Sequence, residues 1–331
     1  MSRNATLDML RGYALVSIML NHMPLGFLRQ FTLVNFAIFD AAELFVLLSG
    51  FLVGLVWIKV EAHEGLRAAQ WRFLRRAGQV WLALVIGGVL LALLSRGLFA
   101  LGLDHTAIWS EYARWIEKYP LPYIGTLALM WMQPNLLDVL ALYVILLASA
   151  PVLVPLLLRW PVAFAAGSVA LWLVSVPLNA MLPNQRVEGG LLFNPFGWQL
   201  LFFTGVAMGP EGKRLADIMW HAVGVVDKWP LDGMRYAAIV AASWLVAVPF
   251  ARPLGLFSAS ALGRGLATIG RGGLFSFVCC VLLSVLGDAM DVNPPGAGVA
   301  RRLGVDIWVI AALWVLSEAW MRRPKPADGR R

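Results

Sequence analysis

Charged residues are scarce in this sequence: 14% of its 331 residues are charged, against 60% that are apolar. No polar stretch is long enough for a separate soluble domain, and no internal repeat or low-complexity segment is visible. Apolar runs long enough to cross a bilayer recur along the whole chain instead. The sequence therefore predicts a polytopic membrane protein, with 1–331 as a single integral-membrane domain, rather than a soluble protein with one anchor.

Cysteine is almost absent, and its placement argues against a metal centre or a disulfide. Cys279 and Cys280 are adjacent in an apolar run, and neighbouring residues of a helix point in different directions. We interpret both as packing residues and expect no metal site. A cleavable signal is also missing, because Arg11 interrupts the first apolar segment and no small-residue cleavage site follows. We therefore predict that this segment is a retained helix.

Nine apolar segments predict helices that cross the membrane. They lie at about 8–27, 40–60, 78–102, 135–157, 161–181, 191–209, 236–251, 273–290 and 303–321. A tenth segment, 213–229, has a shorter apolar stretch that contains Asp217 and His221.

Basic residues predict the orientation of these helices. The segment 67–76 is rich in arginine and the tail 323–331 is basic, whereas 103–134 is nearly neutral. Cytoplasmic loops are rich in Lys and Arg, so we place both termini in the cytoplasm, which requires an even number of crossings. The sequence therefore predicts an all-α bundle of about 10 helices over 8–322, the seventh short or re-entrant, with a cytoplasmic tail. The same basic loops account for the net charge of +8, and we expect no nucleic-acid partner.

The 103–134 segment would then lie outside the cytoplasm. Its aromatic residues suit helices that lie at the membrane interface, as in an aromatic belt. A platform that stacks on a sugar is the alternative interpretation.

Arg11 and His22 lie eleven residues apart in the first apolar segment. Eleven residues make about three helical turns, so the two side chains share one face about 16 Å apart along the axis. This is roughly half the hydrocarbon thickness of a bilayer. A charged or titratable residue at that depth is a candidate for function. The alternatives are that Arg11 reaches the headgroups and that His22 is a hydrogen-bonded structural residue.

Two acids, Asp40 and Glu43, lie one turn apart where the second helix begins, at the level of His22. A carboxylate beside an imidazole fixes its tautomer and raises its basicity. We therefore predict that His22 is catalytic and contacts Glu43, with Asp40 as the second candidate partner. Capping of the second helix is the favoured alternative for Asp40.

Three arginines, Arg72, Arg75 and Arg76, lie just before the predicted third helix. Arg72 and Arg75 share a face at i,i+3. They are either a topology signal in contact with anionic lipid or a cytoplasmic clamp for phosphate groups.

Weaker candidates for substrate or oxyanion contacts lie beside His22, beside Gly50 and near the starts of the fourth and sixth predicted helices. They are Asn21, Ser49, Asn135, Asp138, Asn194, Trp198 and Gln199. Helix capping explains Asn135 and Asn194 equally well, since a proline adjoins each. For Ser49 we expect a hydrogen bond across a close helix contact rather than a nucleophile.

Five sequence blocks resemble the OpgC family. They are LDMLRG, the Asn21-His22 pair, DAAELFVLLSGF, DVLALY at 138–143 and FNPFGWQLLF at 193–202. The family includes succinyltransferases of osmoregulated periplasmic glucans, and it is similar to the acyltransferase 3 superfamily of integral-membrane enzymes. The superfamily signatures R-x10-H and R-x-x-R correspond here to Arg11 with His22 and to Arg72 with Arg75. The resemblance covers about residues 5 to 320.

The resemblance implies an O-acyltransferase in the bacterial inner membrane. Its co-substrate would be cytoplasmic succinyl-CoA, with acetyl-CoA as the second candidate, and no cofactor would be permanently bound. The acceptor would be a hydroxyl of a periplasmic glucan or other glycan. The CoA phosphates would contact Arg72, Arg75 and Arg76, and the pantetheine arm would pass Arg11. His22 would act as general base. Membrane lipids are further partners, and a homodimer remains open.

Two other functions compete with acyl transfer. A proton-coupled transporter or flippase of a small anion or lipid-linked sugar would use the Arg, His and Glu side chains as a relay. Inverted repeats are typical of such proteins, and none is visible. A structural subunit that has lost activity is the second alternative, against which the intact Arg11, His22 and Glu43 argue.

Overall fold

The computed structural model describes residues 5–105, 107–134, 136–184, 189–211, 233–247, 250–293, 296 and 298–323. Helices joined by short turns account for most of these residues, and no strand occurs among them. The predicted all-α class is therefore confirmed. The predicted helix 213–229, Asn135 and the tail after residue 323 lie outside the described residues.

The first helix, α1 (Ala5–Asn21), ends before the predicted boundary at residue 27. Pro24 has no N–H to continue the helix, and Gly26 follows. The chain instead makes two short 3₁₀ turns, η1 (Leu28–Phe31) and η2 (Leu33–Asn35), before α2 (Ala41–Glu64). His22 therefore lies on the first turn after α1, not inside the helix as predicted.

The third helix, α3 (Leu66–Ala100), begins twelve residues earlier than the predicted start at 78. Gly65, with φ of 86°, separates it from α2. Its first turns are rich in Ala, Leu, Arg and Gln, which favour a helix although they are not apolar enough to look like a membrane span. Arg72, Arg75 and Arg76 therefore lie on α3 itself, not in a loop before it.

The middle of the chain contributes five helices. They are α4 (Ala107–Lys118), α5 (Pro120–Ala128), α6 (Asp138–Arg159), α7 (Pro161–Leu173) and α8 (Ser175–Ala180). The 103–134 segment is thus helical, as its aromatic residues predicted. The predicted helix 161–181 is divided at Val174, which lies between α7 and α8.

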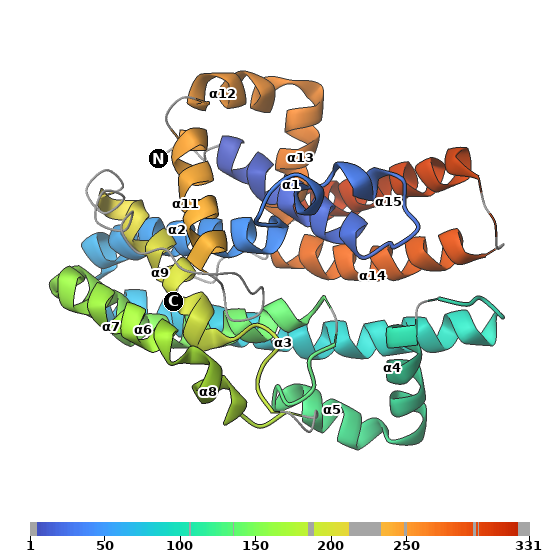
Figure 1. The fold of residues 1–331 in the computed structure, drawn as a ribbon, viewed down its shortest axis with the longest axis horizontal. Coiled ribbons are helices and arrows are strands. Elements are labelled where there is room, and N and C mark those ends of the chain that lie inside the picture. The colour runs from blue at the N-terminus through green and yellow to red at the C-terminus, as the bar shows by residue number, and fades with distance from the viewer. Residues whose placement is uncertain are drawn as a thin grey trace.

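Six helices complete the described chain. They are α9 (Pro195–Glu211), α11 (Gly233–Ala247), α12 (Ala251–Ala259), α13 (Ala261–Gly272), α14 (Leu274–Val292) and α15 (Val299–Met321). No helix was predicted for 253–270, which forms α12 and α13. Helix α13 packs against α1, and α14 and α15 lie side by side (Figure 1). Small residues gave that segment low hydropathy, and the same residues let α13 approach α1 closely.

Glycines set the two closest helix contacts. On α2, Gly50 and Gly54 face the backbone of α9 so closely that a Cβ at either position would overlap it. Gly12 of α1 and Gly270 of α13 meet in the same way. Small residues four apart are typical of tightly packed membrane helices. The prediction that Gly50 permits close approach is confirmed, and the partner is α9.

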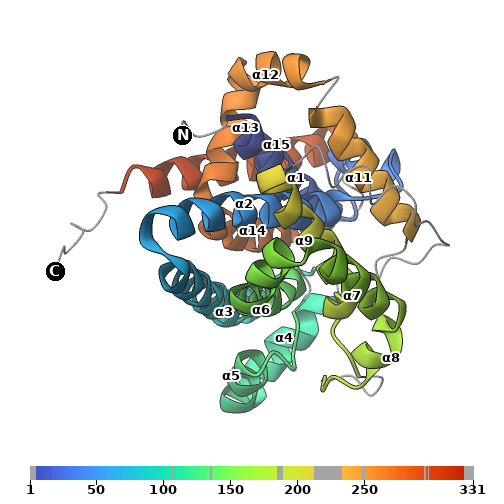
Figure 2. The same cartoon turned by 90° about the vertical axis from the view of Figure 1, so that its left-hand side faces the viewer.

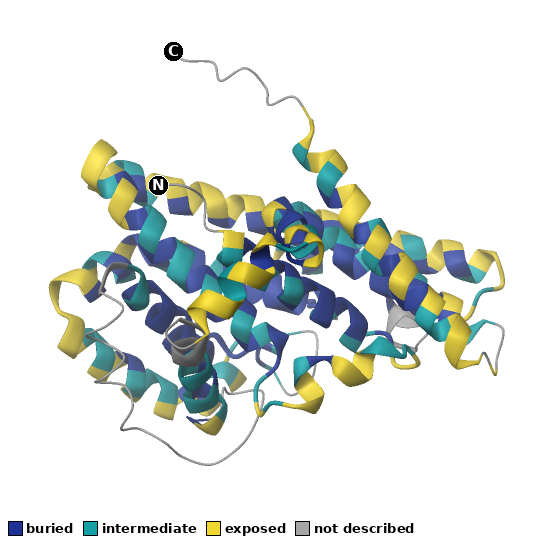
Figure 3. Cartoon of the chain, turned by 90° about the horizontal axis from the view of Figure 1, so that it is seen from above, coloured by how far each residue is buried: buried dark blue, intermediate teal, exposed yellow. Residues whose placement is uncertain are grey.

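Four helices, α2, α3, α6 and α14, are long and apolar enough to cross a membrane. Helices α6 and α14 both lie beside α3, as Figure 2 shows in a view along α3. Buried residues gather where the helices face one another, and exposed residues lie on the outward faces (Figure 3). Exposed Trp81, Leu82 and Ile86 on α3 form an apolar surface typical of contact with lipid. The chain is thus a helical membrane protein, while ten crossings and two cytoplasmic termini stay predictions.

Candidate functional site

Helices α1, α2 and α6 together line two cavities at different heights. We call the first, of about 500 Å³, the arginine cavity. It is lined by Arg11, Ser49, Leu52, Val53, Val56, Arg72, Phe73, Arg75, Arg76, Gln79, Tyr143 and Leu147. We call the second, of about 220 Å³, the histidine cavity. It is lined by Ile18, Asn21, His22, Arg29, Val34, Asp40, Ala41, Ala42, Leu136, Asp138, Val139 and Phe193.

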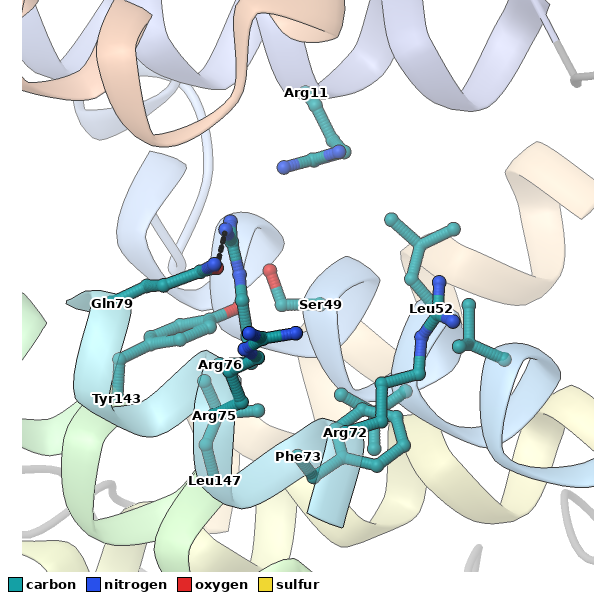
Figure 4. Close-up of a pocket in the computed structure, with 12 residues that line it drawn as sticks. Arg11, Ser49, Leu52, Arg72, Phe73, Arg75, Arg76, Gln79, Tyr143 and Leu147 are labelled. Atoms are coloured by element: carbon teal, nitrogen blue, oxygen red, sulfur yellow. Dashed lines mark hydrogen bonds between the residues drawn. The ribbon is translucent and has the colours of Figure 1, made fainter. Parts of the chain in front are cut away.

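The arginine cavity brings together all four predicted arginines (Figure 4). Arg72, Arg75 and Arg76 come from successive turns of α3, and Arg11 reaches toward them from α1. The Arg76 Nη1 donates to Oε1 of Gln79 at 3.0 Å. None of the described residues that line this cavity is acidic. Four guanidinium groups that line one cavity favour a ligand with several negative charges, such as phosphates.

The wall of the arginine cavity is partly apolar. Leu52, Val53 and Val56 of α2 face Phe73 of α3 and Leu147 of α6. Ser49, also predicted as a site residue, is buried and lies on the same face of α2. Because the three α3 arginines are exposed while Ser49 is buried, the cavity runs from the charged surface into the interior. It can therefore accept an anionic group with a less polar extension.

In the histidine cavity, His22 has one ring nitrogen fixed by the backbone. Nδ1 lies 2.8 Å from the carbonyl oxygen of Ile18. A carbonyl only accepts, so Nδ1 carries the proton and Nε2 is the unprotonated nitrogen of the neutral ring, which is the form that a base needs. The last carbonyls of a helix have no intrahelical partner, which is why the Ile18 carbonyl is available. The Ile18 carbonyl thus holds one side of the His22 ring. The predicted partner, Glu43, binds Arg235 and the Asp40 N–H.

Glu43 instead belongs to a buried ion pair. Its Oε1 accepts from Nε of Arg235 at 2.5 Å, and its Oε2 accepts from the Asp40 N–H at 3.0 Å. Asp40 in turn caps α2, since its Oδ1 accepts from the Ala42 N–H at 2.7 Å. The favoured interpretation of Asp40 as a cap is confirmed. Of the two acids, Asp40 shares the histidine cavity with His22, and Arg235 lies 3.8 Å from its Oδ2.

Two more predicted residues, Asn21 and Asp138, line the histidine cavity. The Asn21 Oδ1 accepts from the Thr32 hydroxyl at 2.5 Å, so its amide nitrogen is oriented as a donor. Asp138 begins α6 and is buried. The structure therefore places Asn21, His22, Asp40 and Asp138 around one space, as their common level predicted.

The predicted residues of α9 have other surroundings. Asn194 accepts from the N–H groups of Phe196 and Gly197, so it caps α9, as the alternative interpretation held. Gln199 exchanges hydrogen bonds with Ser168 of α7, and Trp198 is fully buried. None of the three lines either cavity.

Phe45 lies between the two cavities. It lies on α2 one turn from Ala42, in the histidine cavity, and one turn from Ser49, in the arginine cavity. Its ring packs against Tyr143 and Phe277, with centroid distances of 5.7 Å to each. Phe45 therefore lies on the face of α2 that carries both cavities, between the residues that line them.

Sequence reasoning missed two cations of this site, Arg235 and Arg29. A signal for Arg235 existed: two acids at the start of α2 need a neutralising cation, and Arg235 opens an apolar run. Arg29 lies on η1, at the beginning of the segment between the predicted helices 8–27 and 40–60. It had no signal, because the folding back of this segment over His22 depends on α15. There Asp306 accepts from the Leu28 N–H at 2.7 Å.

One family model matches nearly the whole chain. It is described as OpgC protein and matches residues 3–223 and 210–324. No curated protein and no solved structure matches the sequence.

Proposed function

The chain belongs to the OpgC protein family, and from this premise we propose that it is a membrane-embedded O-acyltransferase. It transfers an acyl group from acyl-CoA to a hydroxyl of a periplasmic glucan or other glycan. Succinyl is the first candidate for this acyl group and acetyl is the second. The observation that carries the proposal is the pair of cavities on α1, α2 and α6. One offers four guanidinium groups to a polyanion, and the other offers a histidine to a hydroxyl.

The donor binds in the arginine cavity. The phosphates of CoA pair with Arg72, Arg75 and Arg76 at the charged surface, and the pantetheine arm runs inward past Arg11. The thioester then passes Phe45 toward His22. From Arg11 to His22 the path along α1 is about 16 Å. The cytoplasmic side, in this proposal, is the side of the α3 arginines.

His22 acts as general base on the acceptor. Nε2 takes the proton of the acceptor hydroxyl while its oxygen attacks the thioester carbonyl carbon. The tetrahedral intermediate collapses with cleavage of the C–S bond, and the CoA thiolate leaves and takes up the proton from His22. The Nδ1–H bond to Ile18 keeps Nε2 in the tautomer that this step needs. The Asn21 amide is a candidate donor to the oxyanion, because its oxygen is already bound to Thr32.

Arg29 supports a succinyl donor over an acetyl donor. It is a guanidinium in the same cavity as His22, and a succinyl group carries a free carboxylate at its far end. The backbone of this residue is well fixed: its carbonyl accepts from the Thr32 N–H and from the Asn35 amide.

Release of CoA by the purified protein tests the proposed reaction. Wild type in detergent, given labelled succinyl-CoA and a glucan, should transfer label to the glucan, and His22→Ala should lose at least two orders of magnitude in rate. If His22→Ala releases CoA and labels glucan at the wild-type rate, His22 is not the base. If wild type transfers no acyl group but moves protons or anions across vesicles, the transporter alternative is correct.

The donor site has a separate test. Arg72→Ala with Arg75→Ala should raise the KM for acyl-CoA and leave the KM for the acceptor unchanged, because only phosphate contacts are lost. Lys59→Ala with Arg67→Ala is the matched control, since it removes two exposed cations that do not line the arginine cavity. Equal donor KM values for the two double variants would reduce the α3 arginines to a topology signal.

A further inference from the structure

Tyr143 carries a buried hydroxyl for which the fold supplies no partner. The residue lies on α6, is 9% exposed and lines the arginine cavity. Its hydroxyl is buried, and no hydrogen-bond partner for it exists in the described part of the chain. Buried tyrosine hydroxyls usually have a partner, because an unmade hydrogen bond in the interior destabilises the fold. A group that is absent from the protein itself is the expected acceptor or donor.

The position of the hydroxyl is fixed by the ring. Phe45 packs against the Tyr143 ring at 5.7 Å between centroids, and Phe202 meets it edge-on at 6.2 Å. Figure 4 shows the ring reaching into the arginine cavity beside Arg76 and Ser49. The side chain is therefore held with its polar end toward the cavity.

The surroundings of the hydroxyl define what it binds. Arginine side chains are donors only, and the Gln79 oxygen already accepts from Arg76. These side chains therefore offer no acceptor to the Tyr143 hydroxyl, and the ligand must supply one, such as a carbonyl oxygen. Tyr143 and Ser49 are buried, whereas Arg72, Arg75 and Arg76 are exposed, so this acceptor lies farther inside than the anionic end.

We propose that Tyr143 binds the acyl donor at the inner end of the arginine cavity, where its hydroxyl donates to an amide carbonyl of the pantetheine arm. This assignment rests on the proposed function, because it takes acyl-CoA as the ligand. The cavity then has two anchors. The α3 arginines bind the phosphates, and Tyr143 fixes the arm beside Phe45, so that the thioester points toward His22.

Binding of three probes to Tyr143→Phe separates the two anchors. The probes are CoA, pantetheine, which has the arm alone, and adenosine 3′,5′-bisphosphate, which has phosphates alone. Tyr143→Phe should weaken CoA and pantetheine by about fivefold, the factor for one neutral hydrogen bond, and leave the bisphosphate unchanged. Arg72→Ala with Arg75→Ala should weaken binding of CoA and of the bisphosphate and leave binding of pantetheine unchanged.

Stability in the absence of ligand provides the control. Tyr143→Phe removes a hydroxyl that has no partner, so the melting temperature of the free protein should stay the same or rise. Tyr123→Phe is the matched variant, since its buried hydroxyl donates to the Gly88 carbonyl at 2.8 Å. It should lower the melting temperature and leave CoA affinity unchanged.

The outcomes distinguish the two proposals. If wild type binds CoA and Tyr143→Phe binds each of the three probes as tightly as wild type does, the role of Tyr143 is overturned. The proposed donor site would then still stand. Wild type that binds neither CoA nor the bisphosphate would refute the proposed donor site, and the Tyr143 assignment with it.

Discussion

Arg29 is the side chain whose charge should decide which acyl group is accepted. Arg29→Gln removes the charge and keeps most of the length of the side chain. We expect kcat/KM for succinyl-CoA to fall by about tenfold or more, because a charge-assisted hydrogen bond to the succinyl carboxylate is lost. The value for acetyl-CoA should not change. Parallel rate measurements with the two donors check this.

The neighbouring Gln30 supplies a control for Arg29. It is exposed on the same 3₁₀ turn but does not line the histidine cavity, so Gln30→Ala should leave both donors unaffected. If Arg29→Gln lowered succinyl and acetyl transfer by the same factor, its role would be structural and not selective.

Arg235 and Glu43 form a pair whose removal should be strongly non-additive. Arg235→Met leaves the fully buried Glu43 carboxylate without its cation, and we expect a loss of about 3–5 kcal/mol of stability. Adding Glu43→Gln to this variant removes the uncompensated charge and should restore a large part of the loss. Heat-induced unfolding of the two single variants and the double variant in detergent measures the coupling. Losses that simply add would show that the two side chains do not interact.

Site residues could be predicted from the sequence where a charged or titratable side chain interrupts an apolar helix. Arg11, His22, Asp40 and Glu43 stand out because charged or titratable side chains are unfavourable in apolar helices. Their partners did not follow, since the Glu43 partner lies 192 residues away on α11. A local pattern defines which groups need neutralising, and only the packing of helices decides which group does so.

At the scale of elements, the contact between α2 and α9 has a clear test. Gly50→Ala places a methyl group against the backbone of Phe202, and we expect it to destabilise the protein by about 1–3 kcal/mol. Gly78→Ala is the matched change on α3, where nothing lies within 4 Å of the new methyl group. This variant should be slightly more stable, by about 0.5–1 kcal/mol, because alanine favours a helix. Equal melting temperatures for the two would contradict the close approach of α2 and α9.

Helix boundaries were predictable from capping and breakers more than from hydropathy. Asp40 marks the start of α2, and Gly65 with its positive φ marks the end. Hydropathy placed the start of α3 twelve residues late, because a polar amphipathic extension does not resemble a membrane span. The same limitation hid α12 and α13, whose small and polar residues form helices that depend on contact with α1.

The orientation of the whole molecule is open to direct measurement. A reporter that is active only in the cytoplasm should be active at the C-terminus and at Gly65, between α2 and α3. It should be silent at Gly102, just after α3. The reason is the cluster of arginines at the start of α3, which favours the cytoplasmic side, and the length of this helix, which suffices for one crossing. Activity at both Gly65 and Gly102 would show that α3 does not cross the membrane.

The sequence by itself determined the class of the molecule and its family. Apolar runs, caps and breakers act over a few residues, so an all-helical membrane protein with costly residues at Arg11 and His22 could be recognised without coordinates. Only the tertiary structure decided the two cavities, the Arg235–Glu43 pair and the place of Tyr143. Each of these depends on side chains from helices far apart in sequence, whose relative positions are set by close packing at glycines and not by any local preference.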